Sequence, residues 1–321
     1  MWRLLVAGCA FALAGSACLA QPSWPDRPLK LVVGFTPGGA ADYVGRTVGD
    51  ALGRVLGQPV IIDNKPGAGS SLAADFVAKA PPDGYTLLIA SPSSISVNPA
   101  LDPKRAATVQ SLVPVAKLSS SPLVVAANPQ LGVRSIPELI AYARRNPGKV
   151  NFSHAGMGSA PHLGGVLFNQ LAGVELTPIP FKGGAPSVQS VIAGDTQVTF
   201  ATPPSVLPQI KGGRLVGLGV TSTERSPLVP DLPGMREAGL PAFRIDFWYG
   251  FFVPHGTPPE IVKKLSEATA AALQRPEVKA ALEREGTEVA PAGTPADFSA
   301  FVKDENHFWA KLARDSGAKA E

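Results

Sequence analysis

The chain has 321 residues, of which 45% are hydrophobic and 17% are charged, and its formal net charge is +4. This composition excludes a disordered chain, and the length exceeds one typical hydrophobic core, so we expect a globular protein of two domains. The basic residues are scattered and form no run with interleaved aromatic residues, so we expect no nucleic-acid partner.

Residues 1–20 have the pattern of a secretory signal peptide. Arg3 gives a positive start, the next ten residues are almost wholly apolar, and Ala20 is a small residue at a suitable cleavage point. We expect export to the periplasm, cleavage near Ala20 and no membrane insertion afterwards, because no later apolar run is long enough to cross a bilayer. Residues 6–9 also resemble a lipoprotein cleavage box, but Arg3 lies too close to Cys9 for an apolar core between them.

Both cysteines, Cys9 and Cys18, lie within this segment. The remaining chain can therefore form neither a disulfide bond nor a thiolate metal site, and its stability must come from its core. Without Arg3, 28 basic and 25 acidic residues remain, and this net charge of +3 suits an anionic ligand.

The most informative stretch follows soon after the signal. An apolar run over 29–35 predicts a β-strand, and the turn Pro37-Gly38-Gly39 leads directly into a helix predicted over 40–56. The free N–H groups at such a helix start, together with the helix dipole, favour an anion, and glycines allow a close approach of the backbone. Asp42, early in this helix, either ties the loop or contacts a ligand.

The same order of strand, glycine-rich loop and helix continues through the first half of the chain. It comprises a strand over 60–62, a loop over 67–69, a helix to about residue 79, a turn over 81–84, a strand over 87–90 and a loop over 91–94.

A second block repeats this order. A helix over 135–145 has Ser135 as its N-cap, Pro137 in its first turn and Glu138 at the capping-box position. Then come a strand over 150–153, a loop over 156–159, a helix over 161–171, a strand over 178–181, a loop over 182–186, a helix to residue 193, a strand over 198–201 and a strand over 215–220.

An aromatic strand over 247–253 and amphipathic helices from Pro259, Glu277 and Pro295 end the chain. We expect Trp248 and Tyr249 in this strand to be hinge or core residues. The alternation of strands and helices predicts an α/β fold, and two halves that face each other would line one cleft with helix amino-termini.

The sequence offers few catalytic candidates. The four histidines form no zinc-binding pattern, and no nucleophile elbow or dinucleotide-binding loop is present, so we expect no metal, cofactor or catalytic residues. Ser93 or Ser159 could in principle pair with His162 as a hydroxyl and its base, which keeps an exported serine hydrolase as an alternative.

A series of short motifs occurs in order along nearly the whole chain after the signal. They lie at residues 24–28, 33–42, 63–69, 80–88, 156–163, 181–186 and 256–258, and include Val33-Gly34-Phe35-Thr36-Pro37-Gly38-Gly39-Ala40-Ala41-Asp42 and Phe181-Lys182-Gly183-Gly184-Ala185-Pro186. In this order they resemble the Bug family, the extracytoplasmic solute-binding receptors of tripartite tricarboxylate transporters.

The resemblance implies a type II periplasmic-binding-protein-like fold. Two lobes, each with a central sheet flanked by helices, would enclose a ligand cleft, and two strands would cross between them near Ser121 and Asp246. Domain 1 would comprise residues 21–121 and 247–321, and domain 2 residues 122–246.

The resemblance also implies that the protein captures a small carboxylate and delivers it to membrane transporter subunits, and we expect a monomer. A ligand sensor that signals through a membrane partner would use the same cleft. Mapped by position, the ligand-binding residues would be Phe35, Pro37, Gly38, Gly39, Ala40, Asp42, Ser91, Ser93, Gly156, Ser159, His162, Lys182, Gly183, Gly184 and Thr202.

The chain departs from the family pattern at three places. Phe181 replaces a common tyrosine, His154 replaces a small residue, and Ala201-Thr202 lacks a common acidic residue, which disfavours an amino acid as ligand. His162 could instead be a packing residue and Lys182 a solvated one. We expect Gly38→Val to weaken binding more than Lys182→Ala, because a side chain there should block the backbone from the ligand.

Overall fold

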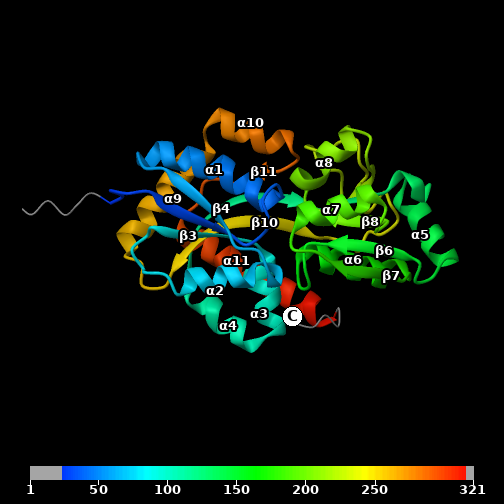
Figure 1. The fold of residues 1–321 in the computed structure, drawn as a ribbon, viewed down its shortest axis with the longest axis horizontal. Coiled ribbons are helices and arrows are strands. Elements are labelled where there is room, and N and C mark those ends of the chain that lie inside the picture. Colours follow the sequence, from blue (N-terminus) through cyan, green and yellow to red (C-terminus); the bar gives the residue numbers. More distant parts are fainter. Residues whose placement is uncertain (1–23, 316–321) are drawn as a thin grey trace, which may run out of the picture.

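Two β-sheets, each covered by helices, form two lobes that lie side by side (Figure 1). The computed structural model describes residues 24–315, so the predicted signal peptide, its cleavage point and both cysteines lie outside the described residues. Within these residues no helix combines the length and the apolar character that a membrane crossing needs.

The first lobe contains a six-stranded sheet in the order β11-β4-β10-β3-β1-β2. Strand β1 pairs in parallel with β2 and β3, whereas β10 pairs antiparallel with β3 and β4. Its strands are β1 (Leu29–Val33), β2 (Val60–Asn64), β3 (Thr86–Ala90), β4 (Leu112–Pro122), β10 (Asp246–Pro254) and β11 (Glu288–Val289).

Helices cover both faces of this sheet, which explains why β1 and β3 are apolar and buried apart from Lys30 and Thr86 near their starts. Buried side chains of α1, α9 and α10 pack on one face, and those of α2 and α11 pack on the other. The helices of this lobe are α1 (Ala40–Leu56), α2 (Ser71–Ala78), α3 (Asn98–Leu101), α4 (Pro103–Gln110), α9 (Pro259–Leu273), α10 (Pro276–Arg284) and α11 (Pro295–Asp315).

The second lobe contains a five-stranded sheet in the order β7-β6-β8-β5-β9. Its strands are β5 (Val124–Ala127), β6 (Val150–His154), β7 (Leu176–Pro180), β8 (Val198–Ala201) and β9 (Val216–Val220). Side chains of α5 (Ile136–Arg145) and α6 (Ala160–Ala172) join one core, and those of α7 (Gly184–Ala193) and α8 (Pro203–Lys211) join another on the opposite face.

The chain crosses between the lobes at two adjacent segments. Strand β4 belongs to the first sheet and β5 to the second, and only Leu123 separates them. The buried Thr221 hydroxyl accepts a hydrogen bond from Leu123 N–H and donates one to the Ile245 carbonyl, both at 2.8 Å. One side chain therefore links both crossing segments.

Most predicted elements are confirmed with small shifts of their ends. The helix predicted over 40–56 is α1, and Ser135 caps α5 by accepting from Glu138 N–H at 3.3 Å. The carboxylate of Glu138 accepts from Arg134 N–H rather than from its cap residue. Strands β4, β5 and β11 and helices α3, α4 and α8 were not predicted as such.

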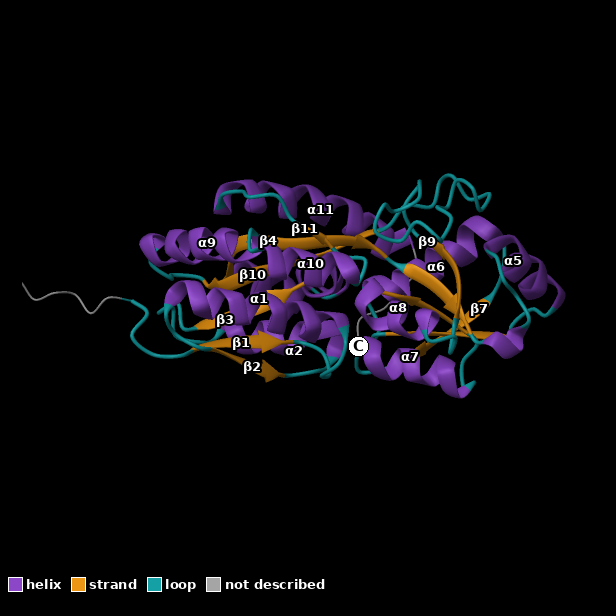
Figure 2. Ribbon diagram, turned by 90° about the horizontal axis from the view of Figure 1, so that it is seen from above, coloured by secondary structure: helices purple, strands orange, loops and turns teal. Residues whose placement is uncertain are grey.

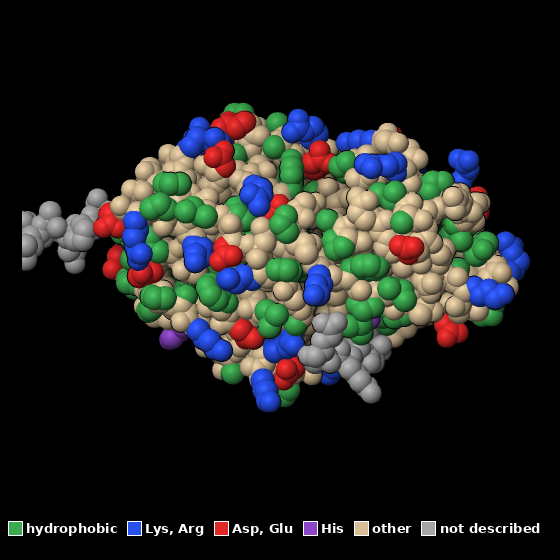
Figure 3. Space-filling view, in the orientation of Figure 1, with side chains coloured by type: hydrophobic (Ala, Val, Ile, Leu, Met, Phe, Trp, Pro, Cys, Tyr) green, Lys and Arg blue, Asp and Glu red, His purple; other side chains and the backbone are tan. Residues whose placement is uncertain are grey.

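The surface carries charges of both signs. In the orientation of Figure 3, lysine and arginine side chains alternate with aspartate and glutamate over both lobes, without a continuous basic stripe on this face. Many of these charges form exposed ion pairs, such as Arg225 with Glu237 and Arg54 with Asp50.

Candidate ligand-binding site between the lobes

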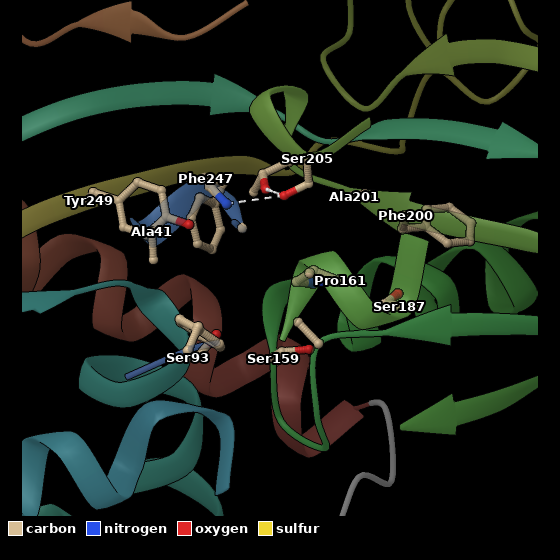
Figure 4. A pocket seen from close by; sticks show the side chains of 16 residues that line it. Ala41, Ser93, Ser159, Pro161, Ser187, Phe200, Ala201, Ser205, Phe247 and Tyr249 are labelled. Carbon is tan, nitrogen blue, oxygen red and sulfur yellow. Dashed lines mark hydrogen bonds between the residues drawn. The ribbon is translucent and has the colours of Figure 1, made fainter. Parts of the chain in front are cut away.

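A narrow cavity with a volume of about 30 Å³ lies where the two lobes meet (Figure 4). This volume holds little more than a water molecule, so the two lobes lie close together around it. Both lobes supply its walls, which comprise Phe35, Gly39, Ala40, Ala41, Ser93, Phe247 and Tyr249 from the first, and Ala155, Ser159, Pro161, Gly184, Ser187, Phe200, Ala201, Thr202 and Ser205 from the second.

The lining of this cavity is mostly apolar and carries no charged side chain in the described residues. Aromatic rings alternate with serine and threonine hydroxyls, and no lysine, arginine, aspartate or glutamate lines the wall within the described part of the chain. Residues 24–315 also hold no group of three histidine, cysteine, aspartate or glutamate side chains that could bind a metal ion. Any net attraction for an anion must therefore come from hydroxyls and backbone N–H groups.

Helix α1 begins at this cavity and brings backbone donors to it. Ala40 N–H donates to the Ser205 hydroxyl of the opposite lobe at 3.1 Å, and Gly38 N–H donates to Asp42 at 3.0 Å. The N–H groups of Gly39 and Ala41 make no hydrogen bond to residues 24–315. These two donors, with the dipole of a 17-residue helix behind them, have the geometry that favours an anion.

Asp42 ties the loop before α1. Its carboxylate accepts from Gly38 N–H, from Asn64 Nδ2 and from Arg46 Nε, at 3.0, 3.0 and 2.9 Å. Burial raises the pKa of Asp42, but the hydrogen bonds from Arg46, Gly38 and Asn64 outweigh it and hold the pKa below its usual value. Its oxygens are thus occupied by the protein.

The facing loops of the two lobes approach each other closely. A Cβ atom on Gly183 would lie 2.8 Å from Thr36 Oγ1, and one on Gly39 would lie 3.6 Å from Ala185 N. Gly38 does not share this property, because its Cβ would meet nothing within 4 Å. A side chain at residue 183 would therefore collide with the first lobe, one at residue 39 would make an ordinary contact, and Gly38 is favoured by its φ of +81°.

His154 and His162 form a buried pair behind the second-lobe loop. Their ring centroids are 4.5 Å apart, His154 Nδ1 donates to the Gly156 carbonyl, and His162 Nδ1 accepts from Gly158 N–H. Burial lowers the pKa of His154 to about 3, with a further contribution from its neighbour, and lowers that of His162 to about 4. Both rings are neutral at pH 7.

No serine hydroxyl bonds to either ring within the described residues. Ser159 Oγ accepts from the backbone N–H of His162, and Ser93 Oγ accepts from Ala160 N–H. The nucleophile–base pair of a serine hydrolase is absent from the contacts of residues 24–315.

The structure sorts the residues predicted for the site into three groups. Seven line the cavity, namely Phe35, Gly39, Ala40, Ser93, Ser159, Gly184 and Thr202. Gly156 and Lys182 line a neighbouring hollow that shares Phe35 and Ala155 with the cavity. Outside both walls, Pro37 and Gly38 are exposed, whereas Asp42, Ser91, His162 and Gly183 are buried.

Several lining residues were not predicted. Phe247 and Tyr249 point into the cavity from β10, whereas Trp248 between them packs on the opposite face and donates to Glu305 (Figure 4). The alternation of side chains along a strand could have separated the two faces. No local sequence pattern marks Ser205 as a lining residue, because its contact with Ala40 joins residues that lie 165 positions apart in the chain.

The sequence comparisons agree with this geometry. Residues 44–317 match the model of the tripartite tricarboxylate transporter family receptor. The chain belongs to this family. Among curated members, BugT of Bordetella pertussis is 36% identical over 99% of each chain, and the predicted Bug family membership is confirmed.

Solved structures of receptors from this family have the same fold. Rpa4515 of Rhodopseudomonas palustris, solved with adipate, has a TM-score of 0.88 and 34% identity, over 92% of this chain and 99% of its own. MatC from the same organism, solved with bound malate, has a TM-score of 0.85 and 34% identity, over 90% and 99%. The predicted two-lobed periplasmic-binding fold is confirmed.

Proposed function

We propose that this receptor captures a small carboxylate between its lobes and delivers it to the membrane subunits of a tripartite tricarboxylate transporter. The observation that carries the proposal is the interlobe cavity, into which helix α1 directs two unpartnered N–H groups between neutral walls. Backbone donors in a site shielded from water bind an anion without a lysine or arginine.

The neutral lining also supports a choice among anions. A buried ammonium group needs a carboxylate partner, and the cavity wall in residues 24–315 has none, since Asp42 is already engaged. The proposal therefore favours an organic acid without an amino group. The adipate and malate of the two relatives belong to this class.

Closure around the ligand would be a hinge motion of two rigid lobes. The proposal divides the chain into residues 21–121 with 247–321 and residues 122–246, so that Leu123 and Ile245 lie at the hinge. Ligand binding then shifts the protein toward the closed state by its higher affinity for that state. We infer that a monomer performs this cycle and then docks on the transporter.

We also infer that the protein is exported and acts without catalysis. The pattern of residues 1–20 supports cleavage near Ala20 and residence in the periplasm, where other members of the family act as binding proteins. Mass spectrometry of protein from the periplasmic fraction should give an amino-terminus at Gln21. A fluorophosphonate probe should leave Ser93 and Ser159 unlabelled, and labelling of either would favour the hydrolase.

Thermal unfolding with a ligand panel tests the binding function. Protein that has been unfolded and refolded to remove copurified ligand is heated with malate, adipate, citrate, an aromatic acid or glutamate. A carboxylate at 100 times its Kd should stabilise the fold by about 2.7 kcal/mol, and glutamate should have no effect. The proposal is wrong if no carboxylate raises the unfolding temperature.

A further inference from the structure

The lobes are joined across the cavity by two hydrogen bonds that mirror each other. Ala40 N–H, at the start of α1 in the first lobe, donates to Ser205 Oγ of the second lobe at 3.1 Å. Ala160 N–H, at the start of α6 in the second lobe, donates to Ser93 Oγ of the first lobe at 3.2 Å. Each helix thus receives a hydroxyl from the opposite lobe.

Neither helix can supply this partner from its own lobe's cap residue. The N-cap of α1 is Gly39, which has no side chain, and the N-cap of α6 is Ser159, whose hydroxyl accepts from His162 N–H instead. Among residues 24–315, the N–H groups of Ala40 and Ala160 therefore have hydrogen-bond partners only when the lobes are together.

The two serines also line the ligand cavity (Figure 4). A hydroxyl that accepts a hydrogen bond still has its own proton to donate, and the bond that it accepts makes it a stronger donor. Thr202 Oγ1 lies 3.3 Å from Ser205 Oγ, and either hydroxyl can be the donor in this pair, so the Ser205 proton is available to the cavity when Thr202 donates. Gly184 makes room for this hydroxyl, because a Cβ there would lie 2.9 Å from Ser205 Oγ.

We propose that Ser93 and Ser205 form a reciprocal clasp that couples ligand binding to lobe closure. In the closed state each hydroxyl accepts from the helix of the opposite lobe and donates to an acceptor oxygen of the ligand. When the lobes separate, each hydroxyl loses the N–H group that polarises it, so both donors are complete only in the closed protein. The ligand of the clasp rests on the proposed function. The effect of the two interlobe hydrogen bonds on closure does not depend on that function.

The test compares Ser93→Ala, Ser205→Ala and the double variant with the control Ser190→Ala. Ser190 is buried in α7 outside the cavity wall, and its hydroxyl pairs with Thr196 of its own lobe. Calorimetric titration with adipate or malate measures the Kd. Each clasp variant should bind about three- to tenfold more weakly, as expected for the loss of one hydrogen bond.

A second readout measures the separation of the lobes. Expression without residues 1–20 gives a chain free of cysteine, so spin labels at Lys79→Cys and Gln189→Cys report one distance. Both residues are exposed: Lys79 directly follows α2, and Gln189 lies in the middle of α7. Both helices lie on the side of the molecule away from β4 (Figure 2). Without ligand, the clasp variants should shift the distances toward longer values, whereas Ser190→Ala should not.

Each pattern of results decides a separate claim. Unchanged distances in both clasp variants would overturn the coupling to closure, even if their Kd values rise. Longer distances with unchanged Kd values would overturn the donation to the ligand. If the parent protein binds neither acid, the proposed function fails, and the distances measured without ligand still test the clasp.

Discussion

At residue 183 the backbone conformation and the contact between the lobes both require glycine. Its φ of +141° and ψ of 176° lie in a region that only glycine adopts readily, and its α-carbon faces Thr36 of the opposite lobe. Any side chain there would both strain the loop and hold the lobes apart. Gly132 has a positive φ of +75° as well, but a Cβ there would meet nothing within 4 Å.

We expect Gly183→Ala to weaken binding of the carboxylate at least about tenfold, because closure is obstructed, whereas Gly132→Ala leaves the Kd unchanged. Both variants should lose about 1–3 kcal/mol of unfolding free energy from backbone strain. Calorimetric titration and urea unfolding measure the two quantities. Equal Kd values for the two variants would show that binding does not need so close an approach.

At the scale of elements, the strand–loop–helix units were readable from the sequence because their signals are local. Apolar periodicity over 40–56 and the glycine turn before it specify α1 and its free donors without any distant residue. Strand β4 was missed because its prolines and serines resemble a loop, and its pairing depends on β10 and β11 far along the chain. Three prolines likewise hid α8, although two of them occupy its first turn, where proline is tolerated.

The candidate site divides in the same way. The glycine turns were predicted from the order of residues, whereas Ser93 and Ser159 were expected from the family resemblance, and both serines line the cavity. The Ser205 contact was not predicted, since it exists only after two lobes have formed and met. Asp42 was placed in the site by its position in a motif, while its hydrogen bonds to Asn64 and Arg46 make it a support of the loop.

The rings of the two buried histidines, one at the end of β6 and one near the start of α6, pack against each other. Their burial predicts that the free energy of unfolding depends on pH. Both rings are neutral in the folded protein down to about pH 4, whereas the unfolded chain protonates them below the ordinary histidine pKa of 6.5. The unfolded state therefore binds more protons in this window. The unfolding free energy should fall by up to about 1.4 kcal/mol per pH unit for each histidine as the pH drops from 6.5 to 4.

His154→Asn tests this effect, because its amide can still donate to the Gly156 carbonyl. Urea unfolding across the window should show a shallower loss of stability with acid in the variant than in the parent protein. Above about pH 7.5 the two pH profiles should run parallel, which serves as the internal control. Parallel profiles throughout the acidic range would contradict the burial of a neutral ring.

For the whole molecule, Thr221 is the residue that connects the two crossings. Thr221→Val keeps the volume but leaves Leu123 N–H and the Ile245 carbonyl without their hydroxyl partner in a buried place. We expect a loss of roughly 2–4 kcal/mol of unfolding free energy. Thr269→Val in α9 is the matched control, since this buried hydroxyl donates only to its own helix at Leu265, and the loss should stay within about 1 kcal/mol. If both variants lose the same unfolding free energy in urea, Thr221 does not stabilise the connection between the lobes more than an ordinary buried threonine stabilises its helix.

The position of β10 has a consequence for how the molecule is made. This strand lies between β4 and β3, yet it comes more than 120 residues after β4 in the chain. A ribosome needs about 6–25 s to add that many residues, and during this time the second sheet can be finished while β3 and β4 still wait for their shared neighbour. The lobe that is begun first during synthesis is therefore completed last.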